Sequence, residues 1–217
     1  PTQTWTIEGS TSCAASSYRW FRDVFCDLEK AAGSVSGISS YDMINNQIAS
    51  VPPGANGVTY LSYLQGADGV RSNPKCAGGF AGLRLGTTKA EMARAVMEGI
   101  CYEMRVVVEH QLSTGVKLNG IRLAGGATKS PMWCQMMADI FQQTIIVTNA
   151  EEAGCLGGAL IGGIGVGIYQ DAEDASKQAC RIVNTFEPNP ANKAAYDDGF
   201  NRFNKLYDSL SAGFYND

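Results

Sequence analysis

Residues 120–148, GIRLAGGATKSPMWCQMMADIFQQTIIVT, predict a strand, a tight turn, a helix and a second strand in direct succession. The first strand covers Gly120 to Ala124, and the β-branched run from Thr144 to Thr148 is typical of a buried second strand. The helix between them begins with Ser130 as its N-cap and Pro131 in its first turn, where the missing N–H of proline costs least. This alternation predicts an α/β layered domain with right-handed crossovers. The apolar stripe of the helix is expected to consist of Trp133, Met136, Met137, Ile140 and Phe141.

A long helix is predicted upstream of this unit. Thr88 and Glu91 form a capping box, in which each side chain satisfies a backbone N–H at the start of the helix. His110 is interpreted as a residue at the edge of this helix and not as a catalyst. Apolar residues at helical spacing predict one buried face, made of Met92, Val96, Ile100, Met104 and Val107.

Shorter elements are expected on both sides of these two units. Val51-Pro52-Pro53-Gly54 is predicted to be a turn, because paired prolines cannot continue a helix. The other expected strands are Thr4–Ile7, Val58–Leu64 and Gly79–Leu85. The other expected helices are Tyr18–Phe25, a short one that follows a break at Gly33–Ser40 and ends near Ala49, about Asp171–Asn184, and Pro190–Ser211.

A glycine-rich helix is predicted after the second strand, with Glu151-Glu152 at its start. Its residues Gly154, Gly158 and Gly162 recur every fourth position and give the helix one smooth face. We expect this face to lie against the sheet or a nucleotide cleft, where it would leave room for a flat base. Close packing on the sheet is the simpler of the two explanations.

Composition excludes several classes of function. The 217 residues carry a net charge of −4, which provides no basic field for nucleic acid. The seven cysteines include no Cys-x-x-Cys pair and the chain has one histidine, so neither a zinc site nor a disulfide framework is predicted. The uncharged stretch from Ala153 to Tyr169 is shorter than the roughly 18 residues of a membrane span. A cytoplasmic protein with reduced thiols, bound to neither nucleic acid nor membrane, is expected.

The turn after the first strand is the best candidate for a binding site. Gly125 and Gly126 let a ligand approach the backbone closely, and the following helix start offers free N–H groups and a positive dipole end for a phosphate. Tight packing is the alternative explanation for two glycines at this position. The turn is neither a Walker A loop, because Thr128 stands where that loop needs glycine, nor a Gly-x-Gly-x-x-Gly fingerprint. No spacing pairs the candidate acid–base groups Asp23, Asp68, Asp139, Glu151 and Glu152.

Several sequence blocks resemble one family. Residues 78–83, GGFAGL, and residues 91–98, EMARAVME, with seven residues between them, match the second signature of the FGGY carbohydrate kinases. Residues 19–23, RWFRD, residues 125–133, GGATKSPMW, and residues 152–159, EAGCLGGA, are similar to further blocks of the family. The blocks are most similar to xylulokinase-like members.

The resemblance implies a fold and an activity. The fold is an actin-like ATPase (ribonuclease H-like) domain, a mixed sheet flanked by helices, whose first strands are expected upstream of Pro1. Residues 1–217 would be the C-terminal, nucleotide-binding domain, with the sugar-binding domain as an N-terminal partner. The enzyme would use ATP and Mg²⁺ to phosphorylate a hydroxyl of a sugar or polyol, with a xylulose-like substrate favoured. A homodimer is an open possibility.

The resemblance also implies roles for individual residues. The nucleotide would be held by Gly125, Gly126, Ala127 and Ser130, with Ala15 and Arg19 at two further positions that carry glycine and glutamine in glycerol-kinase-like members. The catalytic aspartate of the family lies in the N-terminal half, so no catalytic or metal-binding residue is expected in this chain, and the chain alone is expected to be inactive. The loop Gly66–Arg71 departs from the common Gly-Glu-Arg-Thr-Pro, so the sugar stays open.

Two other functions remain as alternatives. One is a non-catalytic actin-like module, in which ATP binding only switches a surface for assembly. The other is an α/β interaction domain that binds no nucleotide.

Overall fold

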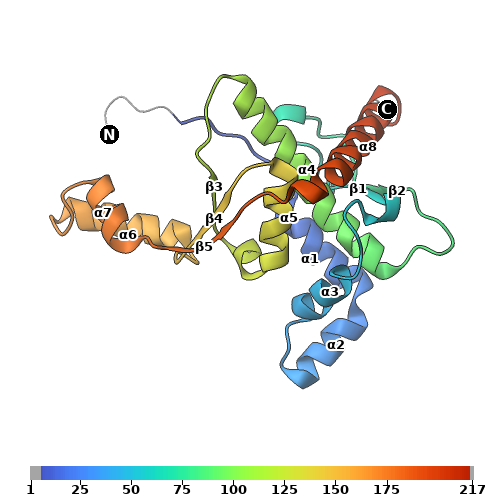
Figure 1. The fold of residues 1–217 in the computed structure, drawn as a ribbon, viewed down its shortest axis with the longest axis horizontal. Helices are drawn as coiled ribbons and strands as arrows, with labels where there is room; N and C mark the ends of the chain where they lie inside the picture. Colours follow the sequence, from blue (N-terminus) through green and yellow to red (C-terminus); the bar gives the residue numbers. More distant parts are fainter. Residues whose placement is uncertain (1–5, 216–217) are drawn as a thin grey trace.

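The computed structural model describes residues 6–215 of the chain (Figure 1). Its helices and strands alternate along most of the sequence, as the first-stage patterns indicate. In chain order, with η for a 3₁₀-helix, the elements are α1 Ala14–Phe25, α2 Asp27–Ser36, α3 Ser40–Ile48, η1 Ala55–Gly57, β1 Thr59–Leu61, η2 Gly69–Arg71, β2 Gly79–Ala81, α4 Lys89–Ser113, β3 Ile121–Leu123, η3 Gly126–Lys129, α5 Pro131–Phe141, β4 Ile145–Thr148, α6 Ala153–Gly165, α7 Ala172–Ala179, β5 Ile182–Phe186, η4 Pro190–Asn192 and α8 Lys193–Ala212.

Helix α4 forms the centre of the molecule and packs against α1, α3, α5 and β1. Its predicted capping box is confirmed, because the Thr88 hydroxyl accepts from the Glu91 N–H at 3.2 Å and the Glu91 carboxylate accepts from the Thr88 N–H at 2.6 Å. Val96 and Ile100 are fully buried on its inner face. His110 is exposed near the end of the helix, as expected.

A small antiparallel sheet lies beside α4. Strands β1 and β2 pair so that Tyr60 stands opposite Phe80. Both strands are shorter than predicted. Strand β2 ends at Gly82, whose φ of 80° lies in the left-handed region, and a Cβ there would come within 2.5 Å of the Gly57 carbonyl oxygen. The backbone must therefore turn at this point, and only glycine fits.

The main sheet has the order β3-β4-β5 and confirms the predicted strand–turn–helix–strand unit. Strands β3 and β4 are parallel, with Ile121 opposite Ile145, and α5 connects them. The predicted cap is present, since the Ser130 hydroxyl accepts from the Trp133 N–H at 3.3 Å and Pro131 opens the helix. All five residues of the predicted apolar stripe of α5 are buried. The fold class, an α/β domain with a mixed sheet flanked by helices, is confirmed.

The prediction of a helix from Asp171 to Asn184 is wrong beyond Ala179. Helix α7 ends there, and Ile182–Phe186 form β5, which pairs antiparallel with β4. The reason is tertiary: Asn149, just after β4, accepts from the Arg181 N–H through its side chain and donates its own N–H to the Arg181 carbonyl. These contacts draw the chain into the sheet, where β-branched residues are favoured.

Two predictions near the N-terminus also need correction. Helix α2 continues through the expected break to Ser36, and the chain turns at Gly37, which has a φ of 74°. In the expected strand Thr4–Ile7, residues 4 and 5 lie outside the described part of the chain, and residues 6 and 7 are not in a strand.

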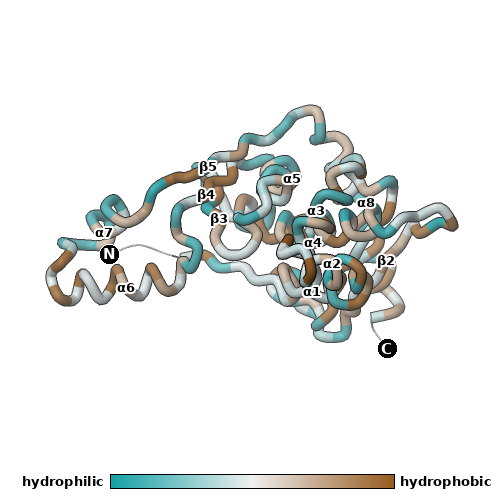
Figure 2. The backbone as a smooth tube through the Cα atoms, turned by 90° about the horizontal axis from the view of Figure 1, so that it is seen from below, coloured by the Kyte–Doolittle hydropathy of each residue, from teal (hydrophilic) through white to brown (hydrophobic). Residues whose placement is uncertain are grey.

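Helices α6 and α7 form a lobe that projects from the rest of the molecule (Figures 1 and 2). The prediction that Gly154, Gly158 and Gly162 pack on the sheet is wrong. All three are exposed, and a Cβ built on any of them would meet no atom within 4 Å beyond the backbone of its own helix. Helix α6 packs on α7 instead. Among residues 6–215, no helix has both the length and the apolar character needed to cross a membrane.

Candidate nucleotide site

The glycine turn between β3 and α5 is open to solvent. Gly125 adopts a φ of 84° and ψ of −169°, a conformation that suits only glycine, and η3 begins at the next residue. A Cβ on Gly125 or Gly126 would meet no atom within 4 Å. Close packing inside the described chain therefore does not explain the two glycines, and the space in front of the turn is free for a ligand.

Hydrogen bonds hold the turn in one conformation. The Gly125 carbonyl accepts from the Thr128 N–H at 3.1 Å and from the Thr128 hydroxyl at 2.8 Å. The Ala127 carbonyl accepts from the Ser130 N–H at 3.1 Å and from the Cys134 thiol at 3.6 Å. The turn is thus preorganised, and the start of α5 behind it contributes the positive end of the helix dipole.

Ser130 links the turn to the neighbouring helices. Its hydroxyl oxygen accepts from the Trp133 N–H at 3.3 Å and from the Asn45 amide at 3.5 Å. The Asn45 amide oxygen in turn accepts from the Tyr18 hydroxyl at 2.7 Å. No acceptor within residues 6–215 takes the hydroxyl proton of Ser130, so this proton is available to a ligand oxygen.

Helix α1 forms a second side of the site. The Tyr18 ring meets the Trp133 ring edge-on, with 5.4 Å between centroids, and this contact fixes α1 against α5. Ala15 and Arg19 lie one turn apart on α1 and are both exposed. Among the described residues, neither is joined to the glycine turn by a hydrogen bond or an ion pair. The structure therefore brings their helix to the site without bringing their side chains onto the turn.

The start of α6 lies near the turn on a third side. The Lys129 ammonium is 3.7 Å from the Glu151 carboxylate, and both side chains are largely exposed. An exposed pair of this kind contributes little stability, and Lys129 can exchange its partner easily. Sequence reasoning missed Lys129 and Asn45 as parts of the site. Asn45 is 85 residues from Ser130 in the sequence, so no local pattern could have found it.

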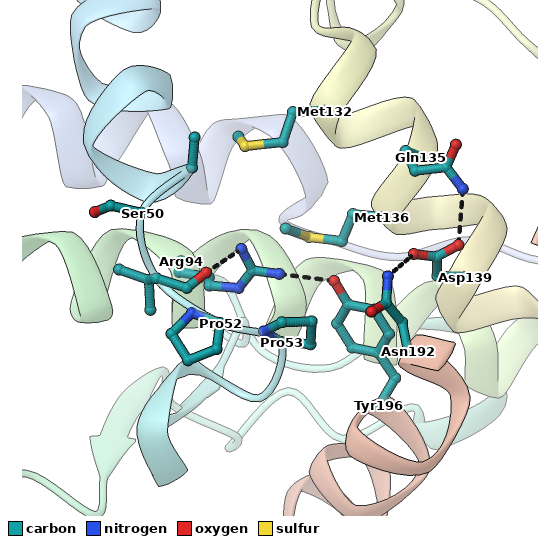
Figure 3. A pocket seen from close by; sticks show the side chains of 12 residues that line it. Ser50, Pro52, Pro53, Arg94, Met132, Gln135, Met136, Asp139, Asn192 and Tyr196 are labelled. Carbon is teal, nitrogen blue, oxygen red and sulfur yellow. Dashed lines mark hydrogen bonds between the residues drawn. The ribbon is translucent and has the colours of Figure 1, made fainter. Parts of the chain in front are cut away.

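A separate pocket of about 430 Å³ lies on another face of α5 (Figure 3). Arg94 donates to the Val51 carbonyl at 2.7 Å, the Tyr196 hydroxyl at 2.8 Å and the Glu98 carboxylate at 2.8 Å. Burial raises the pKa of Glu98, and the Arg94 guanidinium opposes this. Asp139, on the other wall, is buried and accepts from Gln135, Asn192 and the Asn189 N–H. Because these groups satisfy one another, the pocket ties α4, α5 and α8 together.

The candidate carboxylates do not form a catalytic pair. Asp23 pairs with Arg22, and Asp139 holds the segment before α8. Asp68 is exposed, and the Gly69 N–H and Ser10 hydroxyl lower its pKa. Within the part of the chain that the structure describes, no three His, Cys, Asp or Glu residues are placed to hold a metal ion.

The class of protein follows from these features. A mixed sheet flanked by helices, with an open glycine turn before a helix, defines an α/β nucleotide-binding domain of the actin-like ATPase class. Solved structures share the fold: a ligand-bound xylulose kinase from Lactobacillus acidophilus matches with a TM-score of 0.81 and 24% identity, over 94% of this chain and 40% of that one. A glycerol kinase from Plasmodium falciparum, solved with ADP, matches with a TM-score of 0.69 and 21% identity, over 91% and 37%.

The family is shown by sequence. The family described as "FGGY family of carbohydrate kinases, C-terminal domain" matches residues 1–166. A xylulose kinase from Staphylococcus epidermidis is 31% identical over 199 residues, which are 92% of this chain and 38% of that protein. The chain belongs to the FGGY family of carbohydrate kinases. It spans less than two-fifths of the length of this curated relative, and matches the part of the family called its C-terminal domain.

Proposed function

We propose that this chain is the ATP-binding part of a carbohydrate kinase that transfers the γ-phosphate of ATP to a hydroxyl of a sugar or polyol. The open glycine turn is the observation that carries the proposal, because its backbone is free of side chains on the ligand side. The names of the similar proteins, xylulose kinase and glycerol kinase, support this class of substrate. A xylulose-like sugar is the favoured substrate.

The residues around the turn fit a nucleotide. Gly125 and Gly126 expose backbone to the ribose or inner phosphates, and the start of α5 provides N–H groups and a positive dipole end for a phosphate oxygen. The Ser130 hydroxyl donates its free proton to the nucleotide, while its oxygen stays engaged as the cap. Lys129 adds a positive charge at the rim and can leave Glu151 for a phosphate.

The remaining parts of the reaction are assigned outside this chain. Phosphoryl transfer depends mainly on positioning and on neutralising charge. Mg²⁺ would be carried with the ATP phosphates, since no carboxylate cluster is present among the described residues. An N-terminal half would hold the sugar and supply the general base, and closure of the two halves would align the reactants and exclude water.

The test separates binding from catalysis. We expect the 217-residue chain to bind ATP in a calorimetric titration and to show no sugar-dependent ADP release. The missing base alone is typically worth about 10²–10⁴-fold in rate. The full-length protein is expected to phosphorylate a sugar or polyol. Turnover by the purified chain that disappears in Asp68→Asn or Asp139→Asn would contradict the division of roles. ATP binding without turnover by the full-length protein would favour the assembly module.

A further inference from the structure

Helix α6 has an unusual environment for its composition. Its 13 residues, AGCLGGALIGGIG, contain no charged or polar side chain apart from the thiol of Cys155. A helix that is apolar on every side is normally buried. In this structure Gly163 is its only buried residue, and Ile161 is 72% exposed.

The uncovered apolar surface extends beyond α6. Val166 and Ile168, in the turn after the helix, are 77% and 69% exposed. Ile182 and Val183 of β5 are each 60% exposed, and because successive strand residues point to opposite faces, the sheet is uncovered on both sides at this edge. Figure 2 shows the lobe standing away from the body, with apolar β5 leading back from it. We call Ile161, Val166, Ile168, Ile182 and Val183 the lobe surface.

The second helix of the lobe has the ordinary pattern of a surface helix. Helix α7 buries Ala175 and directs Glu173, Asp174 and Lys177 to solvent. Its exposed side is therefore polar and needs no cover. The contrast places the uncovered side of the lobe on α6. A contiguous apolar patch of this kind on a soluble domain marks an interaction site.

The geometry points to the occupant: we propose that the lobe surface is covered by the polypeptide that precedes residue 1 in the longer kinase. This inference rests on the proposed function, in which this chain is one part of a larger enzyme. Strand β3 lies at an edge of the described sheet, and such an edge can accept a further strand.

The fold comparison supports this occupant. The match to the solved xylulose kinase leaves out about 6% of this chain, roughly 13 residues, whereas α6 and α7 together span residues 153–179. At least part of the lobe therefore belongs to the shared fold of a chain of which only 40% is matched. The rest of such a chain is present in every molecule and is large enough to cover the lobe.

The distribution of apolar residues argues against a second copy as the occupant. Cys155 and Ile161 are six positions apart, which places them about 240° apart around the helix. A two-fold contact between copies would cover one side of α6. A polypeptide that runs along both sides is needed to cover both residues.

Thiol reactivity tests the proposal directly. Cys155 is exposed, whereas Cys13, Cys26, Cys76, Cys101 and Cys134 are buried and report on correct folding. Alkylation of Cys155 by N-ethylmaleimide, followed by peptide mass spectrometry, is measured in this chain and in the full-length protein. The same measurement on Ile161→Cys probes the other side of the helix. Leu28→Cys on α2, which is 79% exposed and far from the lobe (Figure 1), serves as the matched control.

We expect alkylation of Cys155 and of Ile161→Cys to slow at least tenfold in the full-length protein, while Leu28→Cys reacts equally in both proteins. Unchanged reactivity of both probes would overturn the proposal. Protection in the short chain that rises with concentration, together with a doubled mass, would assign the surface to a second copy and overturn it as well. Kinase activity is assayed separately. Loss of protection in an active enzyme refutes this inference alone, and protection in an inactive protein refutes the proposed function alone.

Discussion

Replacing Gly126 by valine separates a binding role of the glycine turn from a folding role. A Cβ at Gly126 would meet no atom within 4 Å, and its φ is outside the left-handed region, unlike that of Gly125. The free energy of unfolding should therefore change by less than about 0.5 kcal/mol, as for other open surface positions. The two valine methyl groups, in contrast, would occupy the space in front of the backbone where the nucleotide is proposed to lie.

The expected loss of ATP binding follows from the contacts that valine would block. A hydrogen bond to a charged group is worth about 1.5–3 kcal/mol, which corresponds to roughly 10- to 150-fold in affinity. We expect the KM for ATP of the full-length enzyme to rise within this range, while sugar affinity without nucleotide and the melting temperature stay constant. Gly125→Ala is the matched control, because a φ of 84° should cost it about 1–2 kcal/mol of stability. A folded Gly126→Val enzyme with normal KM for ATP, or one that loses ATP and sugar binding equally, would refute the assignment.

Three further predictions concern stability. Ser130→Ala should cost about 1 kcal/mol of unfolding free energy through the lost cap and also weaken ATP binding, measured by chemical denaturation and calorimetry; an unchanged affinity would remove Ser130 from the site. Burial raises the pKa of Glu103 from 4.5 to about 7, so the folded state retains a proton that the unfolded state has released between these values, and stability falls as pH rises through this window. Glu103→Gln, which keeps a partner for the Ser62 hydroxyl, should reduce the resulting pH dependence of unfolding, worth up to roughly 3 kcal/mol, and an unaltered pH profile would contradict it. Gly158→Leu should leave the melting temperature of this chain unchanged, because the position is open, but lower that of the full-length protein by overpacking the covered lobe; equal effects in both would contradict the covering.

Local signals predicted the elements that define the candidate site. The capping box at Thr88 and the Ser130–Pro131 helix start were both confirmed, because each depends on residues within one turn of helix. The apolar stripe of α5 was confirmed for the same reason. The glycine turn was located from the sequence, and the structure removed the packing explanation for it. The roles of Ala15 and Arg19, which came from family resemblance, stay predictions.

Signals that depend on distant contacts were misread. Strand β5 was predicted as helix, because residues 171–184 continue a helical pattern and its sheet partner β4 is more than 30 residues away. The contact of Asn45 with Ser130 could not be anticipated at all, since a pairing of this kind follows from the packing of α3 on the core. These errors share one cause: the deciding partner lay outside the window that local periodicity samples.

The glycines of α6 show the same limit on a larger scale. Glycine inside a helix costs about 1 kcal/mol relative to alanine, and α6 contains six glycines. Only at Gly163 would a side chain collide with this chain, where a Cβ would stand 2.8 Å from the Tyr169 ring. The other five cost roughly 5 kcal/mol of helix stability for which the described residues offer no packing reason. Such a cost is tolerated where another backbone or a ligand must approach the helix closely, so the contacts that explain α6 are expected outside this chain, with the upstream polypeptide and with the nucleotide.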